Sequence, residues 1–111
     1  MCSMALATTF FPLPMFLSLW ETDLSRAPLD PKERLAGWAK LLNMIREDLE
    51  SGRLKDWGSF PGEHAGYAIV EGTELDVFTV TERYVPFVQF ETHSVLSLSQ
   101  VLEGMKALAQ A

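Results

Sequence analysis

Two polar side chains, Glu91 and His93, have the types and spacing that best suit catalysis in this chain. Residues two apart on a β-strand point to the same face, so the carboxylate can lie beside the imidazole. A carboxylate in that place favours the protonated ring and orients it, as a general base requires. The alternative is a polar strip at an interface or on a solvent-facing edge. The pair supplies two metal ligands at most, so we expect no metal site.

A second group of residues suits ligand binding. Asp56 alternates with Leu54 and Phe60 along a predicted strand, which predicts that its carboxylate is partly buried. Aromatic side chains can line an apolar cavity. The sequence therefore predicts a ligand pocket formed by Trp20, Asp56, Trp57, Tyr67 and Tyr84. The alternatives are that the aromatic rings are ordinary core and that the aspartate meets water at a sheet edge.

Composition excludes several function classes. The chain has 111 residues and a net charge of −6, which argues against nucleic acid or an anionic membrane as a partner. The only cysteine, Cys2, permits no intramolecular disulfide and suits a reducing cytoplasm, where we expect the protein. Glycine-rich phosphate loops and the common hydrolase and zinc motifs are absent, so we expect no cofactor. Glu63 and His64 follow a predicted turn and are expected to be solvated.

The chain divides into a short extension and one domain. Residues 1–14 are apolar, carry no basic residue and are interrupted by Pro12 and Pro14, so we expect a loosely ordered extension rather than a spanning helix. An export signal is the alternative, but it would want basic residues before the apolar run. Met15 is the expected functional start, and residues 15–111 are expected to form a single α+β domain.

The first half of that domain predicts a strand, a long helix and a hairpin. Residues 15–21 are apolar on both strand faces, which indicates burial on both sides. Asp30 suits an N-cap, and an apolar stripe follows it, formed by Leu35, Trp38, Leu41, Leu42, Ile45 and Leu49. Gly52 suits the left-handed position that ends a helix. Two strands, 54–60 and 65–71, then flank a turn at Pro61 and Gly62.

The second half predicts a helix, a strand and a terminal helix. Thr73 can cap a helix that reaches Tyr84, although the β-branched run from Val77 to Thr81 also suits a strand. A strand follows at 87–96. Ser97 and Gln100 form a capping box for the terminal helix, whose apolar stripe is Leu98, Val101, Leu102, Met105 and Leu108.

The order β-α-β-β-α-β with an added helix is the ferredoxin-like arrangement, an antiparallel sheet with helices on one face. Because its strands are apolar on both sides, we expect a second copy of the chain to cover the other face. Three motifs carry a family resemblance: KDWGSF at 55–60, GYAIVEG at 66–72 and FETHSVLSLSQV at 90–101. With them, residues 15–108 resemble small, uncharacterised single-domain members of the dimeric α/β-barrel superfamily. That superfamily includes cofactor-free monooxygenases, lactone isomerases, haem-dependent proteins and proteins without known activity, so the fold alone does not choose a function.

The function that we expect is a non-catalytic one. The leading hypothesis is a cytoplasmic homodimer that binds a small apolar or aromatic ligand or acts as an interaction module. The alternative is a cofactor-independent isomerase or monooxygenase, with His93 and Glu91 acting as an acid-base pair on an aromatic or lactone-like substrate.

Overall fold

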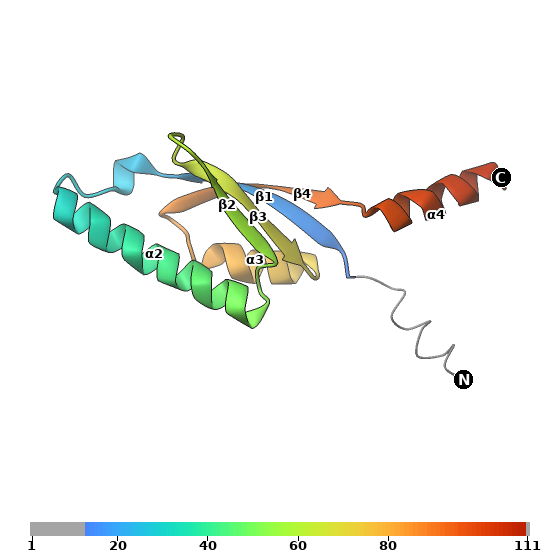
Figure 1. Cartoon of the computed structure of the whole chain (residues 1–111), viewed down its shortest axis with the longest axis horizontal. Helices are drawn as coiled ribbons and strands as arrows, with labels where there is room; N and C mark the ends of the chain where they lie inside the picture. The colour runs from blue at the N-terminus through green and yellow to red at the C-terminus, as the bar shows by residue number, and fades with distance from the viewer. Residues whose placement is uncertain (1–12, 111) are drawn as a thin grey trace.

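Four antiparallel strands form one sheet in the order β2-β3-β1-β4 (Figure 1). The computed structural model describes residues 13–110, so most of the predicted N-terminal extension lies outside the described residues. The strands are β1 (Met15–Thr22), β2 (Asp56–Phe60), β3 (Ala65–Glu71) and β4 (Val88–Val95). The helices are η1 (Leu24–Arg26), α2 (Pro31–Ser51), α3 (Glu74–Glu82) and α4 (Leu98–Ala109).

The predicted α+β class and the predicted order of strands and helices are confirmed. For residues 73–84 the sequence allows either a helix or a strand, and the structure has a helix there, α3. Thr73 and Asp76 form a reciprocal capping box, in which each side chain accepts a hydrogen bond from the other residue's backbone amide. This local pairing of side chain and backbone outweighs the strand preference of the β-branched residues that follow.

Caps also fix the other helix ends and the hairpin. Asp30 accepts a hydrogen bond from the Glu33 amide at 3.1 Å, which begins α2. Gly52 ends this helix at a φ of 85°, in the left-handed region that the sequence predicts. In the turn between β2 and β3, Gly62 has a φ of 77°, which a residue with a Cβ rarely adopts.

Helices α2 and α3 lie on the same side of the sheet and cover one of its faces (Figure 1). Along β1 the buried residues Phe16, Ser18 and Trp20 point toward these helices. On α3, Val77 and Val80 are buried, whereas Phe78 is exposed. The core is therefore a single apolar layer between the sheet and two helices.

The other side of the sheet, called here the open face, combines an apolar centre with polar edges. Its centre is formed by β1 and β3 and consists of Met15, Leu17, Leu19, Tyr67 and Ile69. Residues of β4 and β2 lie beside it: Leu17 pairs with His93, and Ile69 pairs with Asp56. The sequence predicts burial of β1 on both sides, but within one protomer Leu17 and Leu19 are only half-buried.

Two glycines test how tightly this fold is packed. A Cβ at Gly66 would overlap the Gly58 carbonyl oxygen and the Trp20 indole, whereas one at Gly37 would meet open space. We expect Gly66→Ala to lower the free energy of unfolding by roughly 1–3 kcal/mol, as overpacking does. Gly37→Ala, within α2, should raise it by roughly 0.5–1 kcal/mol. Urea unfolding of both variants checks this, and equal stability of the two would contradict the packing at Gly66.

Candidate functional site

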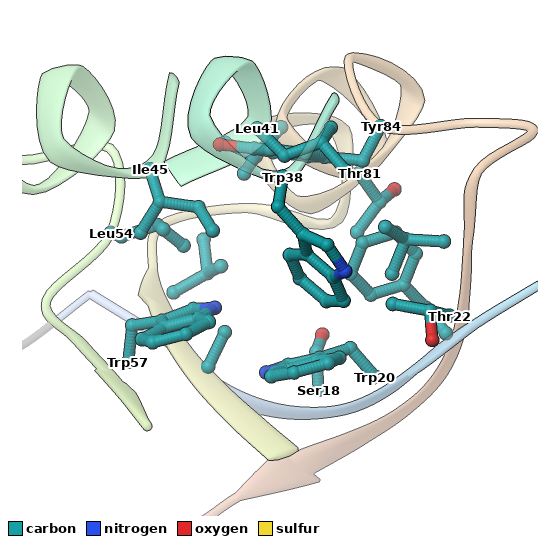
Figure 2. A pocket seen from close by; sticks show the side chains of 15 residues that line it. Ser18, Trp20, Thr22, Trp38, Leu41, Ile45, Leu54, Trp57, Thr81 and Tyr84 are labelled. Carbon is teal, nitrogen blue, oxygen red and sulfur yellow. The ribbon is translucent and has the colours of Figure 1, made fainter. Parts of the chain in front are cut away.

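An apolar cavity lies between the sheet and helices α2 and α3 (Figure 2). Its volume is about 30 Å³, which is room for a water molecule but not for an aromatic ligand. The wall contains five aromatic side chains, Trp20, Trp38, Trp57, Tyr84 and Phe90. Most of the remaining lining is aliphatic and comes from Leu41, Ile45, Leu54, Ala68, Val70, Val80 and Val88. Such a wall suits an apolar guest.

Two stacked tryptophans form one side of the cavity. The rings of Trp20 and Trp57 are 5.3 Å apart between centroids and are inclined by 7°. The Trp20 Nε1 group donates to the carbonyl oxygens of Gly58 at 3.1 Å and Tyr67 at 3.2 Å. The only polar atom of this buried ring is therefore already bonded, and the ring presents an apolar surface to the cavity.

Helix α2 supplies the other side through Trp38, Leu41 and Ile45, which are half-buried. The spacing of three and four residues places them on one helix face. The predicted stripe is only partly right, because Leu35, Leu42 and Leu49 lie outside this face and are exposed by 72%, 44% and 40%. The helix is rotated so that Asp48, a residue to which the sequence analysis gives no role, points inward instead.

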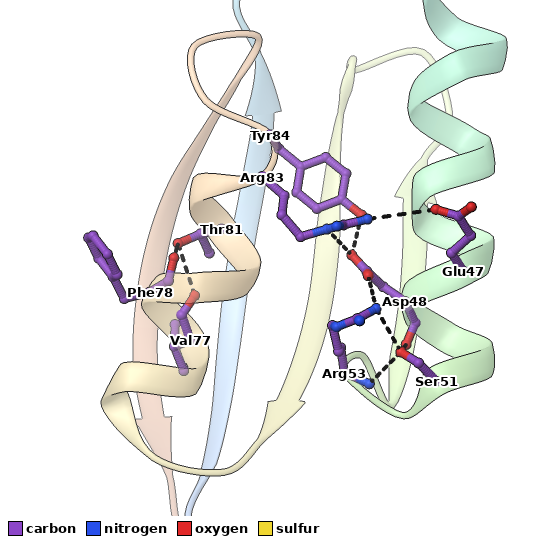
Figure 3. Close-up of polar contacts among 9 residues, drawn as sticks. All are labelled: Glu47, Asp48, Ser51, Arg53, Val77, Phe78, Thr81, Arg83 and Tyr84. Atoms are coloured by element: carbon purple, nitrogen blue, oxygen red, sulfur yellow. Dashed lines mark hydrogen bonds and ion pairs between the residues drawn. The ribbon is translucent and has the colours of Figure 1, made fainter.

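The Asp48 carboxylate is fully buried and joins three segments of the chain (Figure 3). It accepts a hydrogen bond from Arg53 at 3.1 Å and from the Tyr84 hydroxyl at 2.6 Å, and Arg83 lies 3.3 Å away. A buried charge needs such partners, because desolvation of an unpaired carboxylate is costly. The cluster anchors Tyr84, whose ring lines the cavity, to α2. Burial, followed by the hydrogen bond to Asp48, raises the pKa of Tyr84 far above its ordinary value.

The buried polar atoms near the cavity have internal hydrogen-bond partners. The Ser18 and Thr92 hydroxyl oxygens lie 2.8 Å apart and share a hydrogen bond. Across residues 13–110, no buried side-chain nitrogen or oxygen lacks a partner. The described part of the cavity wall therefore presents no spare buried acid or base. It can select a guest by shape and by contact with aromatic rings.

The predicted pair of Glu91 and His93 does form, but on the open face. His93 Nε2 and Glu91 Oε2 are 2.7 Å apart, and the two side chains are exposed by 53% and 71%. Their pairing with Leu19 and Leu17 of β1 places them on the side of the sheet that faces away from the cavity. In this arrangement the pair cannot reach a ligand bound in the cavity.

The five predicted pocket residues divide between the two faces. Trp20, Trp57 and Tyr84 line the cavity. Asp56 and Tyr67 lie on the open face, where the Tyr67 hydroxyl donates to Asp56 at 2.9 Å. The predicted partial burial of Asp56 is wrong, because this residue begins an edge strand and is exposed. The hydrogen bond to Asp56 raises the pKa of Tyr67.

Sequence reasoning missed the cavity residues on α2 and the buried cluster. The signal for Trp38 and Ile45 was present, since both belong to the predicted stripe. The signal for Asp48 is weaker: an acidic residue stands three positions after Ile45, where the inward face continues. Glu63 and His64 are exposed at the hairpin turn, as the sequence predicts.

Residues 13–110 contain neither a metal-binding cluster of side chains nor a membrane-spanning helix. No group of three or more His, Cys, Asp or Glu side chains in this range is arranged to hold a metal ion. No helix of the same range is long and apolar enough to cross a membrane.

Comparison with known proteins adds no functional label. No protein-family model matches the chain, and no curated protein matches it.

The Asp48 cluster predicts a large difference between two neighbouring acidic residues. We expect Asp48→Ala to lower the free energy of unfolding by about 3 kcal/mol, the low end for a broken buried pair. The low end applies because Arg53 and Arg83 are 52% and 35% exposed and can be hydrated. Glu47→Ala removes an exposed partner of Arg83 and should cost less than about 1 kcal/mol. Urea unfolding distinguishes the two, and similar losses would show that the cluster adds nothing beyond a surface ion pair.

The raised pKa of both tyrosines predicts the response to alkali. Both hydroxyls should stay protonated in the folded protein at and just above pH 10, where an ordinary tyrosine ionises. The unfolded chain loses these protons first, so the contribution of the two tyrosines to stability should be fully present below about pH 10 and fall as the pH rises above it. Near-ultraviolet tyrosinate absorbance and urea unfolding measure the two effects. In the Tyr84→Phe variant, the free energy of unfolding should fall less steeply with rising pH above about pH 10. An equally steep fall in the variant would show that Tyr84 is not its cause.

Proposed function

We propose that this protein is a binding module for a small, flat, apolar or aromatic molecule. The observation that carries the proposal is the cavity between the sheet and the helices, whose wall has five aromatic rings and whose buried polar atoms are already bonded. Ligand sites in proteins are mostly apolar and lie between packed elements. With no spare acid or base in the described wall, this geometry favours binding over catalysis.

A ligand requires the cavity to widen. A dry cavity that binds benzene has a volume of roughly 150 Å³, whereas this one has about 30 Å³. The side chains that must yield are Trp38, Leu41 and Ile45, because they are half-buried and belong to a helix at the surface. The stacked pair of Trp20 and Trp57 stays in place as the platform against which the ligand lies.

We further propose that the protomer is ferredoxin-like, that it belongs to the dimeric α/β-barrel superfamily and that it acts in the cytoplasm as a homodimer. Strands β1 and β2 both run antiparallel to β3, which lies between them, so they form a split β-α-β unit. The apolar centre of the open face supports a second copy as its cover. The single cysteine supports a reducing compartment.

A second candidate function, an acid-base enzyme, has one observation in its favour. The imidazole of His93 and the carboxylate of Glu91 are in hydrogen-bonding contact at 2.7 Å, as a general base and its orienting group would be. In a homodimer that closes over the open face, this pair would lie between the two sheets. Its substrate would then occupy the dimer interior and not the cavity.

Binding of 5-fluoroindole, followed by fluorine NMR, tests the ligand proposal. We expect Ile45→Trp to weaken binding at least tenfold, because the larger ring would occupy the space that the ligand needs. The matched control is Leu49→Trp, one turn further along α2 and outside the cavity lining, which should bind as the natural protein does. His93→Ala should also leave the affinity unchanged. Absence of binding to the natural protein, or equal binding by Ile45→Trp, would refute the cavity as the ligand site.

A further inference from the structure

Helix α4 carries an apolar stripe that its own protomer does not bury. The stripe residues are exposed by between 43% and 74% and are Leu98, Val101, Leu102, Met105 and Leu108. No residue of α4 is buried. Figure 1 shows the helix continuing beyond the end of β4, away from the sheet and from α2 and α3. An amphipathic helix forms most stably when its apolar face is packed, so this stripe requires a partner.

The connection to the sheet limits where α4 can go. Strand β4 is paired with β1 up to Val95, which lies opposite Met15. Only Leu96 and Ser97 separate this pairing from the helix, and Ser97 forms a capping box with Gln100. A reversal of the chain onto its own sheet would have to occur within these two residues. The radius of gyration is 18.1 Å, against roughly 13 Å for a compact chain of this length, which agrees with a helix held away from the protomer.

The chain carries a second apolar surface that is only half-buried, the centre of the open face. In a two-fold symmetric dimer, the α4 stripe and the open face of one chain can pack against the α4 stripe or the open face of the other. Two copies of the chain therefore suffice to cover both surfaces. Uncharged residues form the stripe of α4 and the centre of the open face, while charged residues such as Glu91 and Glu103 lie beside them. This arrangement of an apolar centre and a polar rim is that of protein interfaces.

Charge disfavours an anionic lipid surface as the alternative occupant. Helices that lie on membranes carry several basic residues on their polar face. Helix α4 carries one, Lys106, and Glu103 lies one turn before it. The whole chain has a net charge of −6.

We propose that α4 is an intersubunit arm, whose apolar stripe packs on a second copy of this chain in the same contact that covers the open face. The inference rests on the homodimer proposed above and adds to it the element that holds the two copies together. In a protomer alone the arm stays exposed; in the dimer two arms are buried, one from each chain.

Sedimentation velocity over a concentration series tests the arm. The natural chain should sediment as a dimer of 12.5 kDa protomers. Replacement of both Leu102 and Met105 by Glu should weaken dimerisation at least a hundredfold, because charges would enter the contact. The matched control is Ala107→Glu, which adds a charge on the opposite side of the same exposed helix and should leave the dimer intact. Circular dichroism of each variant verifies that the domain is folded.

Isotope-filtered NMR on a mixture of labelled and unlabelled chains decides where the arm lies. Contacts between labelled Leu102 or Met105 methyl groups and unlabelled protons support the proposal. Contacts within one chain only, or a dimer unaffected by the Leu102→Glu and Met105→Glu pair, overturn the arm and leave the homodimer standing. A natural chain that sediments only as a monomer overturns both. The 5-fluoroindole titration reports on the cavity independently, since α4 does not line it.

Discussion

The buried carboxylate of Asp48 is the constraint on which the helical layer depends. A charge without access to water has to be met by donors, and these come from the segment after α2 and from the end of α3. The rotation of α2, the position of α3 and the orientation of the Tyr84 ring are therefore fixed together. We expect the carboxylate to favour the arrangement that brings Arg53, Arg83 and Tyr84 to it, because a buried charge without these donors is costly.

The sheet separates the two candidate sites of this chain, the aromatic cavity and the pair of His93 and Glu91. Because side chains alternate along a strand, β1 directs Ser18 and Trp20 toward the cavity and Leu17 and Leu19 toward the open face. The aromatic wall and the pair of His93 and Glu91 consequently lie on opposite sides of one backbone layer. The first side is enclosed within a protomer. The second becomes enclosed only if another molecule covers it.

Sequence patterns predicted the elements well and the directions of side chains less well. Caps such as Asp30, Thr73 and Ser97 act within a few residues, so the helix starts could be read directly. Asp56 was misplaced because the exposure of a strand residue depends on whether its strand lies at the sheet edge. The role of Asp48 was missed because one of its partners, Arg83, follows it by 35 residues and meets it only in the folded chain.

The position of β1 in the sheet has a consequence for the assembly of the chain on the ribosome. Its residue Leu17 pairs with Ile69 and with His93, which follow it by 52 and 76 residues. The strand that the whole sheet is built around is thus synthesised well before either neighbour, and its pairing closes large loops. Such non-local pairing slows folding and leaves apolar strand surface exposed to other chains meanwhile. Until β4 is synthesised, helices α2 and α3 and the hairpin of β2 and β3 are the parts of the chain available to cover this strand.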